Sequence, residues 1–392
     1  MRLFVTKEMF DGNDILNDIA FEEKDGVIVW MGKVEEHPHE CDEIIDLTHY
    51  FVMPGLIDCH VHISSTSGEQ EPETMADAAH ITVRAIQNLK GLLSAGVVAC
   101  RDLGSIGGVA VGIQKAIDDK VITDVPMVLT CGKSLCATGG HGHEISIECD
   151  GPNEFVKGTR QVIKDGAKIV KLMVSGGVNS PGTEPGPPEL KPEEIKAAVD
   201  EAHMRGRRVS AHCHGYTAIK HCVEQGVDSI EHGVFMEDDL IELMKEKGTY
   251  LVPTLSAPYW ATKEGLRLEP DNPDHKKSNA IIQRHFKVVR DCFDQNVNIA
   301  MGTDAGCPFN PYELAYNELV LLVEAGIKPL DALKIATKNG AELLQLDNLG
   351  VLAVGKQATF LAVDGSPLLD IRSMGKIKNI CLRGSFIREG GV

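Results

Sequence analysis

The pattern of hydrophobic and polar positions divides the chain into two short β-rich ends and a longer middle region in which strand-like and helix-like segments alternate. Residues 1–53 contain short apolar runs separated by turn signals such as Asp25-Gly26, a pattern typical of a small β-domain. From residue 54, β-rich apolar runs alternate with segments whose apolar residues recur every three to four positions, which indicates repeated βα units around a parallel sheet. Residues 346–392 return to short strands, so we expect the two ends to pair into one β-sandwich.

Eight apolar runs between residues 54 and 345 are predicted to be strands. Eight βα units close a (β/α)8 barrel of the TIM type. The predicted fold is therefore α/β, with a TIM-type barrel over residues 54–345 flanked by the β-sandwich of residues 1–53 and 346–392. The runs are GLIDCHVHI, GVVACRDLG, PMVLTCGKSL, KIVKLMVSGG, RRVSAHCHG, DSIEHGVF, TYLVPTLS and NIAMGTDAG.

Composition and charge narrow the classes of partner. The net charge of -18 gives an acidic surface, which repels nucleic acids and anionic membranes and leaves a small molecule or a dipeptide as the expected partner. No apolar run approaches the roughly 20 residues that cross a bilayer, and no secretory signal pattern is present, so we expect a cytoplasmic location. The 11 cysteines form no C-x-x-C pair, so we expect neither structural disulfides nor a cysteine zinc site.

Potential metal ligands gather where the predicted strands end, which is the edge that carries the active site of a TIM-type barrel. His60 and His62 lie two positions apart on the first strand, so both imidazoles project from one face. Two imidazoles aimed at one point favour a metal ion, and the alternative is a surface strand with two solvated histidines. The other strand-end residues are His141 and His143 after the third run, His212 and His214 on the fifth, His232 on the sixth and Asp304 on the eighth.

Lys171 lies between Val170 and Leu172 in the fourth predicted strand, where a buried ammonium group is costly. One explanation is an ion pair with a nearby carboxylate. The other is that desolvation leaves the amine neutral, so that it takes up carbon dioxide and becomes a carbamate, an anionic ligand able to bridge two metal ions.

This set of strand-end residues, together with PGLIDCHVH, DSIEHG and GTDAG, resembles the amidohydrolase superfamily with a two-metal, carbamylated-lysine centre. The resemblance extends over essentially the whole chain. It implies that His60, His62 and Asp304 hold one divalent ion, that His212 and His232 hold the other, and that carbamylated Lys171 bridges them. Zinc is the expected ion, although the ligand types also suit manganese, iron or cobalt. Similar proteins are often homo-oligomers, which we expect here too.

The stretches LMVSGGV, TGGHGH and AHCHGYTAI are similar to the branch that contains prolidase-like dipeptidases, dipeptide carboxypeptidases and imidazolonepropionase relatives. This resemblance implies hydrolysis of an amide bond in a dipeptide or an N-acyl amino acid by a metal-bridging hydroxide. Asp304 is then both a metal ligand and the proton shuttle. Some relatives carry a tyrosine where this chain has His214, so either His214 or Tyr216 is expected to polarise the substrate.

Other residues are candidates for the rim of the pocket. His141 and His143 lie in a glycine-rich loop and are candidate donors to the substrate, the alternative being exposed loop histidines. Residues 175–190 are expected to shape the rim, and residues 256–277 to form a long loop in which Arg267 either binds a substrate carboxylate or is solvated. We expect Arg101 and Asp102 to form a structural ion pair, and Glu231 to point away from the site.

Several alternatives remain at this stage. A hydrolase that opens a cyclic amide such as an imidazolone or hydantoin, or one that cleaves xenobiotic amides, is consistent with the same residues. Deaminases of the superfamily mostly lack the strand-four lysine, so Lys171 argues against them. A catalytically silent scaffold is expected to have lost ligands, and all six are present. The glycines of GSIGGVAVG do not follow G-x-G-x-x-G, which argues against a nucleotide site there.

Overall fold

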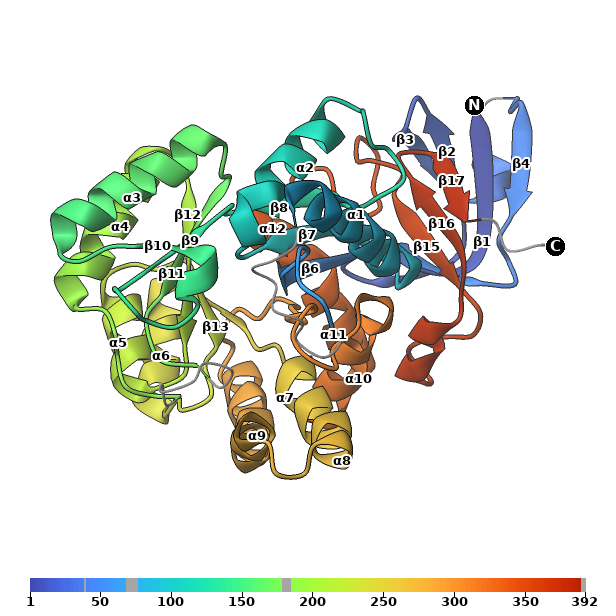
Figure 1. Ribbon diagram of the computed structural model, residues 1–392. Helices are drawn as coiled ribbons and strands as arrows, with labels where there is room; N and C mark the ends of the chain where they lie inside the picture. The colour runs from blue at the N-terminus through green and yellow to red at the C-terminus, as the bar shows by residue number, and fades with distance from the viewer. Residues whose placement is uncertain (39, 68–76, 178–184, 389–392) are drawn as a thin grey trace.

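A computed structural model describes residues 1–38, 40–67, 77–177 and 185–388 of the chain (Figure 1). Its strands are β1 Arg2–Phe10, β2 Ile15–Lys24, β3 Val27–Gly32, β4 Glu43–Asp46, β5 Phe51–Pro54, β6 Leu56–Val61, β7 Val97–Asp102, β8 Met127–Thr130, β9 Ser134–Cys136, β10 Ser146–Glu148, β11 Ile169–Met173, β12 Arg208–Cys213, β13 Ser229–His232, β14 Tyr250–Val252, β15 Phe360–Val363, β16 Ile377–Leu382 and β17 Ser385–Arg388. Its α-helices are α1 Ala78–Ser94, α2 Val109–Asp118, α3 Pro152–Asp165, α4 Pro192–Met204, α5 Tyr216–Glu224, α6 Asp238–Lys247, α7 Ser256–Trp260, α8 Leu266–Leu268, α9 Pro273–Asp294, α10 Asn317–Glu324, α11 Pro329–Ala336 and α12 Lys338–Leu344.

Hydrogen bonds between neighbouring segments close the predicted barrel. β6, β7 and β8 form one parallel sheet, and β11 to β14 belong to a second. Lys168 N donates to Thr130 O over 2.9 Å and joins β8 to β11. On the other side, Ala300 N donates to Leu251 O (3.0 Å) and Asp304 N donates to His60 O (2.7 Å), so residues 298–306 join β14 to β6. The (β/α)8 barrel expected from the eight apolar runs is confirmed.

Two of the eight predicted strands are not regular strands. The third run is divided, because β8 ends at Thr130 and β9 begins only after Gly132, which adopts a positive φ of 66° that favours glycine. The eighth run forms isolated bridges, at Ile299 and Ala305, instead of a continuous ladder. Asp304 lies within this run at a φ of 58°, which is incompatible with an extended strand.

The two chain ends form one mixed sheet with the order β17-β16-β15-β5-β1-β2-β3, in which β4 also pairs with β1. Figure 1 shows the blue N-terminal and red C-terminal strands side by side, and β15 pairs antiparallel with β5 where they meet. The sheet curls: three strands separate β17 from β1 in the strand order, yet the Phe386 ring of β17 lies only 6.0 Å from the Phe4 ring of β1. An apolar core centred on Phe4, Phe21 and Phe360 fills the curl, as expected for a β-sandwich.

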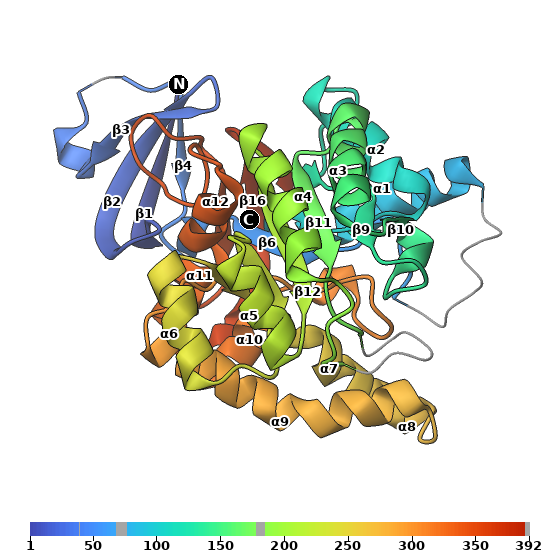
Figure 2. The ribbon, with the colours of Figure 1, turned by 90° about the vertical axis from the view of Figure 1, so that its left-hand side faces the viewer.

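The helices lie outside the barrel strands, as Figures 1 and 2 show for α3 to α6 beside β11 to β13. Proline occupies the first turn of α3, α4, α9 and α11, where its missing N–H has no helical partner to lose. The loop expected over residues 256–277 is mostly helical, with α7, a π-helical turn over Ala261–Gly265, α8 and the start of α9. None of the helices in the described ranges has the length and apolar character needed to cross a bilayer.

We predict that Phe360→Ala destabilises the protein by about 3–5 kcal/mol, because it opens a cavity between Phe4 and Phe21 where the two chain ends meet. The urea midpoint of the full chain measures this effect. Leu369→Ala is the matched control, since its side chain is 91% exposed and its loss removes no core contact. Equal midpoints for the two variants would contradict the role given to the aromatic core.

Candidate functional site

Three of the predicted ligands meet where β6 ends beside the eighth segment. Nε2 of His60 and Nε2 of His62 each lie 3.4 Å from the same oxygen, Oδ1 of Asp304. His60 is 1% exposed and Asp304 is 7% exposed, so this convergence is buried at the carboxyl ends of the strands. The spacing of two residues between the histidines therefore aims both rings at one carboxylate.

Four further histidines continue this cluster across the barrel. The ring centroid of His212 lies 4.2 Å from that of His141 and 4.7 Å from those of His214 and His232. The ring of His232 in turn lies 5.1 Å from His60, which joins the two halves of the cluster. Burial lowers the pKa of His141 to about 4 and that of His214 to about 3, so these rings are uncharged at neutral pH.

Lys171 reaches the same interior from β11 and is 1% exposed. Burial lowers the pKa of its amine, and the Arg101 guanidinium lowers it further, whereas the carboxylates of Glu231 and Asp304 raise it; the net direction is downward. No carboxylate among the described residues lies within ion-pair distance of its Nζ. The ion-pair explanation for this lysine therefore has no partner in the described part of the chain.

Glu231 is the important residue that the sequence analysis placed wrongly. It does not point away from the site: its carboxylate accepts from Nδ1 of His60 at 2.8 Å and from the guanidinium of Arg101 at 2.7 Å. The expected Arg101–Asp102 pair is absent, because Asp102 accepts from Thr130 Oγ1 and Ile63 N instead. Opposite charges inside two apolar strands, VVACRD and SIEH, were the sequence signal for this contact, since each buried charge needs a partner.

Hydrogen bonds behind the cluster set which nitrogen of each ring faces inward. His60 donates through Nδ1 to Glu231, and His62 donates through Nδ1 to the carbonyl of Gly104 (3.0 Å), so Nε2 of both rings stays available. Nδ1 of His232 lies 2.7 Å from Thr254 Oγ1. His232, Thr254 and Asp304 all have positive φ, of 70°, 56° and 58°, a strained backbone state of the kind that occurs at functional sites.

The cluster fits divalent metal ions. Asp304 Oδ1 and His214 Nδ1 are buried without a hydrogen-bond partner in the structure, and such groups are costly unless a ligand satisfies them. Ligand atoms of His60, His232 and Asp304 lie within 4.8 Å of one another, and so do those of His212, His214 and His232. Imidazole and carboxylate donors suit zinc and similar ions. The ligand set expected from the sequence did not include His214, which belongs to the second of these groups, and His232 belongs to both.

The beginning of the expected rim segment, residues 175–177, contacts the histidine cluster. Of the expected rim 175–190, residues 178–184 lie outside the described part of the chain. Ser175 Oγ accepts from His214 N at 3.1 Å. Gly177 approaches His141 so closely that a Cβ there would lie 2.2 Å from ring atom Cε1. These contacts pack the start of the rim segment against the two histidines.

Three residues expected to contact the substrate each have a side-chain contact with a carboxylate outside the histidine cluster. His143 is about half exposed, with Nε2 3.5 Å from Glu144. The hydroxyl of Tyr216 donates to Asp239. Arg267 is 63% exposed in its side chain and donates to Glu264 at 2.8 Å.

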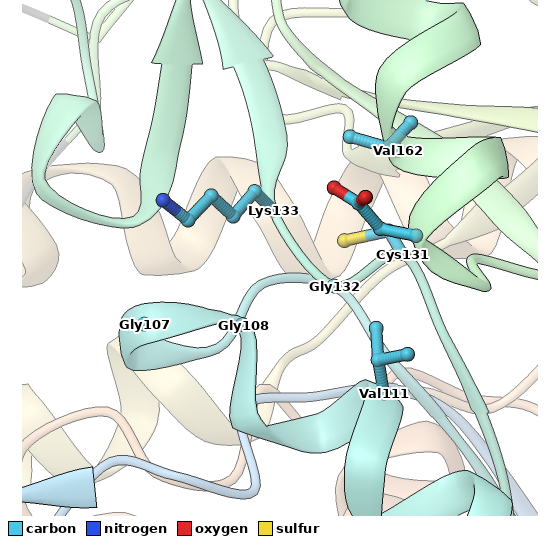
Figure 3. A pocket seen from close by; sticks show the side chains of 8 residues that line it. Gly107, Gly108, Val111, Cys131, Gly132, Lys133 and Val162 are labelled. Atoms are coloured by element: carbon cyan, nitrogen blue, oxygen red, sulfur yellow. The ribbon is translucent and has the colours of Figure 1, made fainter.

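A separate pocket of about 250 Å³ lies between the glycine-rich turn before α2 and the connection from β8 to β9 (Figure 3). Gly107, Gly108, Cys131, Lys133 and Asp165 are among its lining residues. The lining shares no residue with the histidine cluster, and it contains one amine and one carboxylate but no imidazole. This pocket therefore lacks the imidazole donors that the barrel interior provides.

Comparison with known proteins agrees with this geometry. Residues 51–385 match the profile of the amidohydrolase family. An ochratoxinase from Aspergillus niger is 31% identical, over 92% of this chain and 80% of its own length. The structure of a Xaa-Pro dipeptidase with bound methionine superposes with a TM-score of 0.90 at 30% identity, covering 98% of this chain and 99% of that one. A prolidase complexed with N-methylphosphonate-L-proline gives a TM-score of 0.91 at 26% identity, covering 99% of each chain. The chain belongs to the amidohydrolase family and is a metal-dependent hydrolase of amide bonds.

Proposed function

We propose that this enzyme hydrolyses the peptide-like amide bond of dipeptides or N-acyl amino acids. The observation that carries the proposal is the convergence of His60 and His62 on the unpartnered Oδ1 of Asp304, beside a buried lysine. The similar dipeptidase and prolidase structures support the substrate class, because methionine and N-methylphosphonate-L-proline are both amino acids or derivatives of them.

The proposed ligand set places one divalent ion with His60, His62 and Asp304 and a second with His212 and His232. Lys171, after its neutral amine adds to carbon dioxide, would supply a carbamate to both, and His214 is available to the second group. Zinc is the proposed ion, given the nitrogen and oxygen donors. When bound, the two ions would lower the pKa of water to about 7 and so supply a hydroxide nucleophile, and they would polarise the scissile carbonyl.

Asp304 is the proposed proton shuttle. Burial alone would raise the pKa of its carboxyl group, but the neighbouring His60 and His62 lower it overall, so the carboxylate is ionised at neutral pH. It can then accept the proton from the attacking water and deliver it to the leaving nitrogen. Since an amine is a poor leaving group unless it is protonated, this transfer is the step that most needs a positioned side chain.

His141 and His214 are the proposed donors to the substrate carbonyl or carboxylate. Both rings pack against His212, and both are neutral at pH 7, so each retains one N–H to donate. Tyr216 is less suitable, because its hydroxyl is already bonded to Asp239. We therefore favour His214 over Tyr216 for polarising the substrate.

Metal content and a dipeptide library test the function together. We expect about two divalent ions per chain in the barrel site and release of free amino acids from a subset of dipeptides or N-acyl amino acids. Removal of the metal by a chelator should abolish the activity, and zinc should restore it. A protein with no barrel metal and no turnover would rule the proposal out, whereas turnover of cyclic amides alone would assign it to ring opening.

For Asp304→Asn, we predict a fall in kcat on the order of 10²-fold or more with metal content largely retained, because the amide keeps an oxygen ligand but cannot carry the proton. Steady-state kinetics and metal analysis of the same preparation measure both quantities. Asp150→Asn is the control, since Asp150 is an exposed carboxylate whose described side-chain hydrogen bonds are accepted from Thr138, through its backbone N and its Oγ1. An active Asp304→Asn enzyme would exclude the shuttle role.

For Lys171→Ala, we predict loss of the barrel metal and of activity, both partly restored by millimolar short carboxylic acids that replace the bridging carbamate. The same acids should not restore Asp304→Asn, whose defect lies in proton transfer. A lysine that served only in packing would give a variant that is insensitive to added carboxylic acid.

A further inference from the structure

We propose that Glu22, His37 and Cys41 form a second metal site, in the β-sandwich, that binds one zinc-like divalent ion. The site is independent of the proposed function, because none of its residues belongs to the barrel cluster. It also departs from the expectation drawn from the cysteine spacing, since the missing C-x-x-C pairs argued against any cysteine metal site.

The three donor atoms have the spacing of a tetrahedral site. Nε2 of His37 lies 3.3 Å from Oε2 of Glu22 and 3.8 Å from Sγ of Cys41. Ligand bonds of about 2.0–2.3 Å at tetrahedral angles place neighbouring donor atoms roughly 3.3–3.6 Å apart. The donors of all three residues lie within 4.8 Å of one another, so one ion can reach them with small side-chain adjustments.

Glu22 gives the independent sign that a cation belongs here. The residue is 1% exposed, and its Oε1 is buried with no hydrogen-bond partner in the structure. Its neighbour Glu23 is also buried, but Glu23 pairs with Arg2 at 2.9 Å and accepts from Gly26 N. Glu22 has no comparable cation among the described residues except the His37 ring, so a buried carboxylate is left only partly compensated.

The fold holds these donors in place. β2 pairs with β3 through a bulge between Glu22 and Glu23, which changes the direction of the two carboxylates. Trp30 is the β3 partner of Glu22, and its ring lies 4.7 Å from that of His37 in an edge-on contact. A short 3-10 turn over Val34–Glu36 then leads the chain to His37, and Cys41 follows four residues later. The carboxylate, imidazole and thiol therefore face one point before any ion binds.

The donor types select the class of ion. One sulfur, one nitrogen and one oxygen donor suit zinc or cobalt, whereas magnesium and calcium require mostly oxygen donors. With three protein ligands, the fourth position is open to water. The competing explanation is an ion pair between protonated His37 and Glu22, with the Cys41 thiol only nearby.

Cobalt substitution of the full chain separates these two explanations. Cobalt bound to a thiolate has a charge-transfer absorption in the near ultraviolet, which sites made of histidine and carboxylate lack. We expect this absorption in the wild-type protein and its loss in Cys41→Ser, with one fewer metal ion bound per chain and unchanged amide hydrolysis. Cys307→Ser is the matched control. It removes a cysteine of the barrel, three residues after Asp304, and leaves Cys41 in place, so it should retain the absorption.

A second readout uses Trp30, which is one of two tryptophans in the chain. In a Trp260→Phe background, cobalt should quench Trp30 fluorescence. Glu22→Gln should raise the cobalt concentration needed for half-maximal quenching at least tenfold. The proposal is overturned if no thiolate absorption develops, if the absorption is lost in Cys307→Ser but kept in Cys41→Ser, or if Glu22→Gln leaves the quenching unchanged.

Discussion

The buried carboxylate of Glu231 is the contact on which the barrel interior depends. It accepts from His60 of β6, Arg101 of β7, Ser210 of β12 and Ser229 of β13, so one side chain links four strands. Burial alone would raise the pKa of Glu231, but the Arg101 guanidinium and His60 hold it well below its usual range. A charge held in this way fixes the His60 ring, and with it the nitrogen that faces Asp304.

Around this anchor, the site is organised by burial. The packed histidines are neutral because water is excluded from them, and Lys171 is driven toward its neutral form for the same reason. Positive φ angles at His232 and Asp304 bring two donors inward from segments that leave regular strand geometry. The strained backbone and the desolvated donors occur at the same place, as is common at functional sites.

The β-sandwich has its own core and its own chemistry. Its aromatic centre joins strands from both chain ends, and β15 pairs with β5 immediately before the chain enters the barrel. The proposed site at Glu22, His37 and Cys41 lies at the β2–β3 edge of this sheet, beside the bulge between Glu22 and Glu23. A metal ion at this position would tie the loop to β2 without a role in the chemistry of the barrel.

The sequence by itself determined the fold class and the eight barrel segments, because hydrophobic periodicity is a local feature of the chain. Its motifs also resembled those of the amidohydrolase superfamily. His60 and His62 are the best example, since alternation along a single strand already aims both rings the same way. Only the tertiary structure decided what depends on contacts between distant segments. It divided the third run at Gly132, made residues 256–277 mostly helical and turned Glu231 toward Arg101, 130 positions away in the chain. It also brought Glu22 to Cys41, because bulges, strain and charge pairing arise from packing between segments and leave no periodic signal in the sequence.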